Sequence, residues 1–103
     1  MKLTYNGQAA DNAVLSTKIA NKSGIFSVSF TTAAGVHHSA IFTLYDNAGT
    51  PTTVLTAGSG TYFSITGTTD TKVNAYWDTD QVKIENKFGK TLDIKVEGEF
   101  YSV

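Results

Sequence analysis

The sequence predicts one domain, residues 1–103, folded as an antiparallel all-β sandwich of about eight strands. The type is immunoglobulin-like or jelly-roll, and a small open barrel is the alternative. Apolar and polar residues alternate along most of the chain, as in strands with one buried face. An Asx residue followed three positions later by glycine recurs at Asn21–Gly24, Asp46–Gly49 and Asn86–Gly89. Asx side chains and glycines favour type I turns, often with a bulge at the glycine, so each pattern is predicted to close a hairpin.

The first three predicted strands are Met1–Tyr5, which ends at Asn6-Gly7, Ala13–Ala20 and Ile25–Thr32. The inward residues of the second and third are Leu15, Thr17, Ile19, Phe26, Val28 and Phe30. A two-residue loop at Lys22-Ser23 pairs Ile19 with Phe26 and Leu15 with Phe30, the register that cross-strand contacts favour. A wider loop, which pairs Ile19 with Ser27, is the alternative.

Four more strands are predicted at His38–Tyr45, Thr52–Ala57, Thr61–Thr66 and Lys72–Asp78. Pro51 precedes the second of these, where its missing N–H is tolerated. The residues expected to face inward are Ala40, Phe42, Leu44, Phe63, Ile65, Val73, Ala75 and Trp77. Asn74 and Tyr76 face outward. We interpret Trp77 as a core anchor rather than a platform for a ligand.

The last predicted hairpin turns at Asn86–Gly89. With Asn86 opposite Lys90, Ile84 lies opposite Leu92, and Lys83 faces Asp93 as an ion pair. The same register sets Val82 opposite Ile94. The final strand then continues to Phe100, with Gly98 as a candidate bulge.

Charge and composition exclude several classes of protein. The net charge is −1 and the chain has no arginine, so nucleic-acid binding is not expected. It has no cysteine, which removes disulfides and thiolate catalysis. No apolar run approaches the roughly 20 residues of a membrane span. No signal-peptide core follows Met1, so we expect a protein made and used without secretion.

No group of residues predicts catalysis, a cofactor or a metal. His37 and His38 are neighbours in a strand and point to opposite faces. Asp70, Asp78 and Asp80 lack the glycine and glutamate of a calcium loop. Glu97 and Glu99 are about 7 Å apart on one strand face, but the sequence shows no apolar pocket around them of the kind that a catalytic acid needs. The sequence therefore predicts a protein that is not an enzyme.

Outward-facing aromatic residues are the candidate binding residues. The set consists of Tyr45, Tyr62, Tyr76 and Tyr101, together with Ile41. Tyrosine is enriched in protein interfaces because its ring is apolar and its hydroxyl stays wet. Isolated tyrosines also fill cross-strand positions on ordinary sheets, and that alternative remains open.

Four segments carry a resemblance to a known class: Phe42–Thr50, Gly60–Ile65, Val73–Trp77 and Leu92–Phe100. Their texture resembles the short, cysteine-free, Thr/Gly/Asn-rich β-sandwich proteins of tailed-phage virions. That class includes capsid decoration proteins and head–tail or tail accessory proteins. The resemblance implies a structural role in a virion, after synthesis in the host cytoplasm. The implied partners are other capsid or tail proteins, or further copies of the chain. Met1–Ala10 would then be a strand that orders by adding to a neighbour.

Two alternatives come from the same features. One is a carbohydrate-binding module, in which coplanar tyrosines stand beside Asn74 or Asp78. The other is a fibre or adhesin module from a longer chain.

Overall fold

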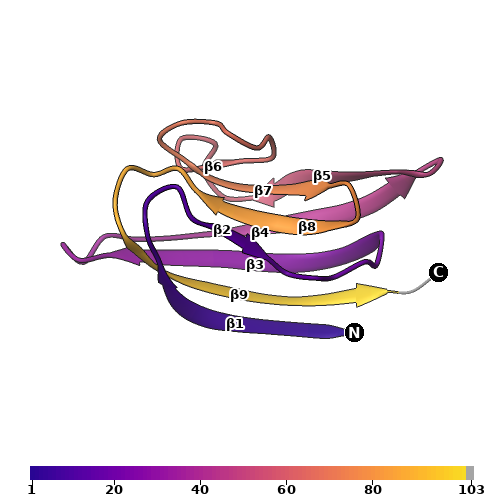
Figure 1. The fold of residues 1–103 in the computed structure, drawn as a ribbon, viewed down its shortest axis with the longest axis horizontal. Coiled ribbons are helices and arrows are strands. Elements are labelled where there is room, and N and C mark those ends of the chain that lie inside the picture. Colours follow the sequence, from indigo (N-terminus) through magenta and orange to yellow (C-terminus); the bar gives the residue numbers. More distant parts are fainter. Residues whose placement is uncertain (102–103) are drawn as a thin grey trace.

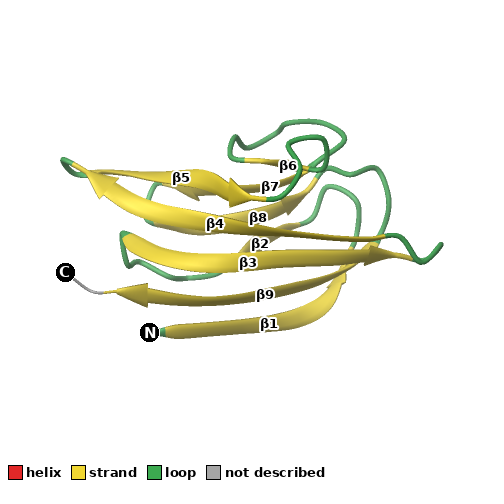
Figure 2. Ribbon diagram, turned by 180° about the vertical axis from the view of Figure 1, so that it is seen from behind, coloured by secondary structure: helices red, strands yellow, loops and turns green. Residues whose placement is uncertain are grey.

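The computed structural model describes residues 1–101, which form two facing β-sheets (Figures 1 and 2). The five-stranded sheet has the order β1 (Lys2–Ala9), β9 (Leu92–Tyr101), β3 (Ser23–Thr32), β4 (His37–Asn47), β5 (Thr50–Ala57). The four-stranded sheet has the order β2 (Val14–Ser16), β8 (Gln81–Asn86), β7 (Val73–Asp78), β6 (Phe63–Ser64). The predicted sandwich is confirmed, and over these residues the sheets do not close into a barrel. The described residues include no helix long and apolar enough to cross a membrane.

Alternation places the core as the sequence predicts. The apolar side chains predicted to face inward on β3 and β4 are all buried: Phe26, Val28, Phe30, Ala40, Phe42 and Leu44. The ring of Phe26 stacks between those of Phe42 and Phe100, at centroid distances of 5.3 and 5.6 Å. This row of rings crosses β4, β3 and β9 and joins three neighbouring strands from inside the sandwich.

The second predicted turn closes a hairpin, as expected. Asn47 lies opposite Thr50, so β4 and β5 are joined by the two residues Ala48 and Gly49. Both have positive φ, at 52° and 90°. This is the type I′ arrangement rather than the expected type I, because it matches the twist of the strands it joins.

The first predicted turn and its hairpin are wrong. The segment Ala13–Ala20 keeps its predicted inward face, but β2 pairs with β8, which sets Leu15 opposite Ile84. Gly24 lies inside β3, opposite Phe100. A Cβ at Gly24 would lie 2.7 Å from the Phe100 ring and 2.6 Å from the carbonyl oxygen of Glu99. The glycine therefore makes room for a ring in the core instead of forming a turn.

The third predicted hairpin is also wrong, although its turn chemistry is present. The Phe88 N–H donates to Asn86 Oδ1 at 3.0 Å, and Gly89 has a φ of 96°. The turn, however, carries the chain from one sheet to the other, so Ile84, Val82 and Lys83 do not face Leu92, Ile94 and Asp93. The buried Asn86 amide donates to the carbonyls of Ala9, Ala10 and Lys90, and these bonds fix a corner.

Three further expectations are corrected. The first strand continues through Asn6-Gly7 and is already ordered against β9, so Met1–Ala10 needs no neighbouring molecule to form a strand. Gly98 is not a bulge, because it pairs straight across with Leu3 and Phe26. The predicted strand Thr61–Thr66 shrinks to β6, which runs parallel to β7 and leaves Ile65 exposed.

Candidate binding surface

Five large side chains share the outer face of the five-stranded sheet, and we call this set the outer patch. It consists of Ile25 on β3, Ile41 and Tyr45 on β4, Val54 on β5 and Tyr101 on β9, each between 40% and 52% exposed. The strand registers make them neighbours. Thr43 of β4 is opposite both Ile25 and Val54, and Ser23 lies opposite Tyr101 and one position from the Gly24–Leu44 pair.

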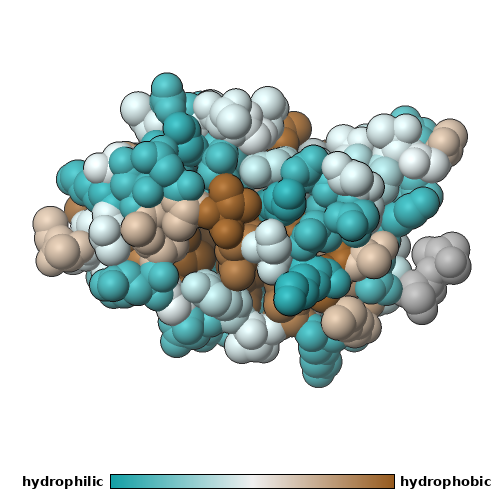
Figure 3. All heavy atoms as spheres, in the orientation of Figure 1, coloured by the Kyte–Doolittle hydropathy of each residue, from teal (hydrophilic) through white to brown (hydrophobic). Residues whose placement is uncertain are grey.

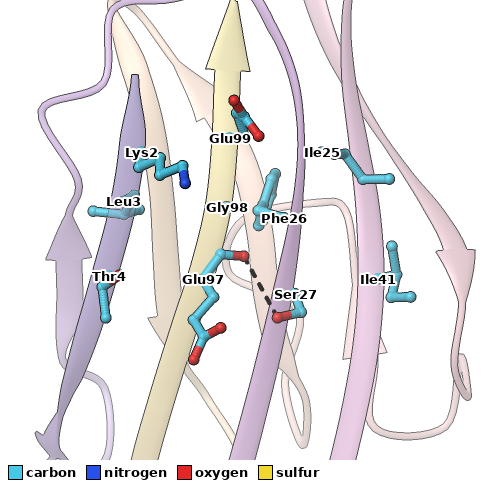
Figure 4. Close-up of a pocket in the computed structure, with 10 residues that line it drawn as sticks. All are labelled: Lys2, Leu3, Thr4, Ile25, Phe26, Ser27, Ile41, Glu97, Gly98 and Glu99. Atoms are coloured by element: carbon cyan, nitrogen blue, oxygen red, sulfur yellow. Dashed lines mark hydrogen bonds between the residues drawn. The ribbon is translucent and has the colours of Figure 1, made fainter.

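A shallow trough of about 510 Å³ runs along part of this face (Figure 4). Ile25 and Ile41 lie side by side at one margin, over β3 and β4. Lys2 and Thr4 of β1 lie at the other margin, across Glu97 of β9. The trough is therefore apolar on one side and polar on the other, a combination typical of protein contact surfaces.

The two outer-face tyrosines flank a second, larger hollow of about 770 Å³ at one end of the sheet. Tyr45 and Tyr101 form its aromatic walls, and Asn21, Lys22 and Asp46 supply polar groups around it. The sequence analysis did not bring these polar residues together with the tyrosines, because the segment before β3 was expected to be a hairpin turn.

The candidate binding residues predicted from the sequence do not all lie on one surface. Tyr45, Tyr101 and Ile41 lie on the outer patch, as half-exposed residues of one face. Tyr62 does not, because its ring stacks on that of His38 at a centroid distance of 3.6 Å and packs against the core. Ile25 also lies on the outer patch, but the sequence analysis did not include it among the candidate binding residues. It alternates with the inward residues Phe26 and Val28, and this alternation could have placed it on the outer face.

Tyr76, Asn74 and Asp78 lie on the four-stranded sheet, apart from the outer patch. Asn74 was expected to be exposed but is fully buried. The loop between β6 and β7 covers it, and its amide donates to the carbonyl of Thr69 and to the Glu85 carboxylate at 3.0 and 2.9 Å. Glu85, itself buried, also accepts a hydrogen bond from the N–H of Thr68.

The same covering loop explains the environment of Tyr76. A Cβ at Gly67 would lie 3.0 Å from the Tyr76 ring, so the loop packs directly on it. Burial, and then the Glu85 carboxylate, raise the pKa of the Tyr76 phenol. The coplanar tyrosines beside Asn74 or Asp78 that a sugar site would need are therefore not formed on this sheet.

Three of the remaining charged candidates, Asp70, Asp78 and Glu97, form ion pairs within the molecule. Lys83 Nζ bonds to Asp78 at 2.6 Å, a bond that lowers the pKa of Asp78 and raises that of Lys83. Asp70 lies 3.4 Å from the ammonium group of Lys87, and Glu97 lies 2.7 Å from that of Lys95. Across residues 1–101, no three His, Asp or Glu side chains gather closely enough to share a metal ion.

The two histidines lie on opposite faces, as predicted. His37 is exposed on the outer face, where Nδ1 and Thr31 Oγ1 are 2.9 Å apart, while His38 is half-buried against Tyr62.

The side of the molecule seen in Figure 3 is mainly hydrophilic, with hydrophobic atoms gathered near its middle.

Comparison with known proteins gives one distant likeness. No family model matches the chain, and no curated protein matches it by sequence. Among solved structures, the chain is similar to the tailspike protein of Acinetobacter phage vB_ApiP_P1, with a TM-score of 0.44 and 13% identity. The match covers 96% of this chain and 21% of the tailspike, so the chain spans about a fifth of that protein's length.

Proposed function

We propose that this chain is a non-enzymatic structural protein of a phage particle, in the manner of a capsid decoration or head–tail accessory protein. It binds another protein of the particle through the outer patch. The observation that carries the proposal is the gathering of five half-exposed apolar and aromatic side chains on one sheet face. Single exposed hydrophobic residues are ordinary, whereas a contiguous group rimmed by polar residues marks an interaction surface.

Charge supports the same reading. A net charge of −1 produces little long-range repulsion between copies packed on one particle. The non-enzymatic part of the proposal is supported by the charged groups, because Asp78, Glu85 and Glu97 are each bonded to neighbours within the fold.

The test is co-sedimentation of the purified protein with phage particles assembled without it. Ile41→Glu should weaken binding by at least about tenfold, since a charge replaces an apolar contact within the patch. Ile65→Glu is the matched control, because Ile41 and Ile65 are both 41% exposed and Ile65 lies in a loop outside the patch. Failure of the unchanged protein to bind particles, or equal binding by the Ile41 variant, would reject the proposal.

A carbohydrate-binding role is the second candidate, favoured by the hollow between Tyr45 and Tyr101. Two aromatic rings with Asn21 and Asp46 nearby supply the stacking and hydrogen-bonding groups that sugar sites use. A glycan array tests this role: Tyr101→Ala should abolish any signal, while Tyr76→Ala on the other sheet should leave it unchanged. A silent array with the unchanged protein removes this candidate.

A further inference from the structure

The free edge of β1 is the least protected strand edge in the molecule. Within residues 1–101, four strands lie at sheet edges, and three of them carry features that discourage pairing. β2 has three residues and β6 has two, while β5 contains Pro51 and sits beside a register shift at Ile41/Phe42. β1 has eight residues, with no proline and no bulge, and Lys2 is its one charged residue. In Figures 1 and 2, none of the other eight described strands lies beyond it.

The pairing of β1 with β9 shows which backbone groups are free. Met1 and Phe100 exchange both of their hydrogen bonds, at 2.7 and 2.8 Å. Bonded and non-bonded pairs alternate along an antiparallel ladder, so Leu3, Tyr5, Gly7 and Ala9 also point their backbone groups toward β9. The N–H and C=O groups that point away, to the free edge, belong to Lys2, Thr4, Asn6 and Gln8.

These four residues are self-complementary. If a second copy approaches antiparallel, Lys2 can face Gln8 of that copy while Thr4 faces its Asn6. The two-fold axis then passes beside Tyr5, and all eight free backbone groups find partners. A shift of two residues in either direction leaves Lys2 or Gln8 unpaired. One register therefore satisfies the whole edge, and it has the closed symmetry of an isologous dimer.

Charge agrees with this register. The lysine at position 2 faces a neutral glutamine, beyond which lies Asp93 of the second copy, the β9 partner of Gln8. The two copies of Lys2 stand six residues apart along the paired strands, about 20 Å, which exceeds the screening length of about 8 Å at physiological salt. No like charges oppose each other on the edge.

We propose that β1 pairs with β1 of a second copy of this chain, joining two five-stranded sheets into one continuous ten-stranded sheet. The pairing uses backbone bonds at an edge separate from the outer patch. Loss of the patch can therefore abolish particle binding and leave the dimer intact, so a failure of the proposed function is distinguishable from a failure of the dimer.

The first experiment is sedimentation velocity of the purified protein from micromolar to millimolar concentration. The unchanged protein should shift from monomer to dimer. Thr4→Pro should remain monomeric, because it removes an N–H that the monomer does not use and places a ring on the edge. Thr4→Ala is the control, because it keeps the N–H and should dimerise as before. The melting temperatures of the unchanged protein and of both variants should be equal at a concentration where all three are monomeric, which would show that the fold is intact.

The second experiment tests the register. Because the chain has no cysteine, a single introduced cysteine can form a disulfide only with a second copy. Tyr5→Cys places two thiols at the axis, where non-bonded antiparallel pairs have Cα atoms about 4.5 Å apart. Leu3→Cys, equally half-buried, places them four residues apart. Mild oxidation should cross-link the first variant and not the second.

Two results overturn the proposal. One is a protein that stays monomeric at every concentration, which would leave the edge to a strand of a different protein. The other is a dimer that the Thr4→Pro variant still forms, or that Leu3→Cys cross-links as well as Tyr5→Cys does, because either result places the contact elsewhere.

Discussion

Replacement of Gly98 by alanine tests how the core determines the outer sheet. Gly98 faces inward on β9, between Leu3 of β1 and Phe26 of β3. A Cβ there would lie 2.5 Å from the Cβ of Phe26 and 3.0 Å from Cε2 of Phe100. The first distance is shorter than real Cβ contacts allow, so the strands or the rings must move.

The cost follows from what stands in the way. The Cβ of Phe26 is fixed to the backbone of the neighbouring strand, and its ring is held in the stack with Phe42 and Phe100. Overpacking of this kind costs about 1–3 kcal/mol. The lower entropy of the unfolded chain with alanine returns about 0.4–1 kcal/mol. The expected net loss in the free energy of unfolding is about 1–2 kcal/mol, or a fall in Tm of about 5–15 °C for a domain of this size.

Urea unfolding followed by tryptophan fluorescence measures the loss. Gly60→Ala is the matched control, because a Cβ there meets nothing within 4 Å and its φ is not positive. That variant should be as stable as the unchanged protein, or slightly more stable. If Gly98→Ala is also as stable as the unchanged protein, the Phe26 Cβ and the Phe100 ring do not occupy the space that the glycine leaves.

Three other substitutions test the turn at Asn86 between the two sheets, the hairpin that joins β4 and β5, and the ion pair between Lys83 and Asp78. Asn86→Ala should lower the free energy of unfolding by about 2–3 kcal/mol in urea, because the buried amide and its bonds to partly buried carbonyls are lost together. Ala48→Asn should raise it by about 0.5–1 kcal/mol, seen as a higher Tm, because asparagine tolerates the left-handed φ of 52° better. The pKa of Asp78 is lowered by Lys83, so its contribution is present above pH 3.8 and is lost as the pH falls through the lower folded value. Asp78→Asn should therefore show a flatter dependence of Tm on pH in that acid range.

The alternation of apolar and polar side chains correctly predicted local features of each strand. It sets which side of its own strand a residue occupies, so Tyr45, Ile41 and Tyr101 were correctly placed on the outer face. It does not say what lies above that side. Asn74 and Tyr76 do point outward from their sheet, but the loop that follows β6 covers them.

Apart from the hairpin that turns at Ala48 and Gly49, strand pairing was the part that the sequence could not supply. The proposed register of Val82–Asn86 with the last strand agreed on both faces, yet the two strands lie in different sheets. Two strands that both alternate can be aligned with apolar residues opposite apolar residues on one face and polar residues opposite polar residues on the other. Such an alignment therefore does not identify which strands are partners. The choice depended on Asn86, whose side chain binds carbonyls near positions 9 and 90, far apart in the chain.

The proposed dimer and the proposed patch would reinforce each other. Pairing through β1 places two outer patches on the same face of one continuous sheet, related by the two-fold axis. A particle surface that repeats its subunits could then engage both patches, and two linked contacts bind more tightly than either alone, by about a hundredfold or more. Thr4→Pro leaves the five patch residues unchanged but removes a side chain at the margin of the trough, so Thr4→Ala, which still dimerises, is its control. Thr4→Pro should weaken particle binding together with dimerisation, and Thr4→Ala should weaken neither. Ile41→Glu should weaken particle binding and leave the dimer intact. If Thr4→Pro abolishes the dimer and binds particles as tightly as the unchanged protein, the patches act singly and the dimer has no part in attachment.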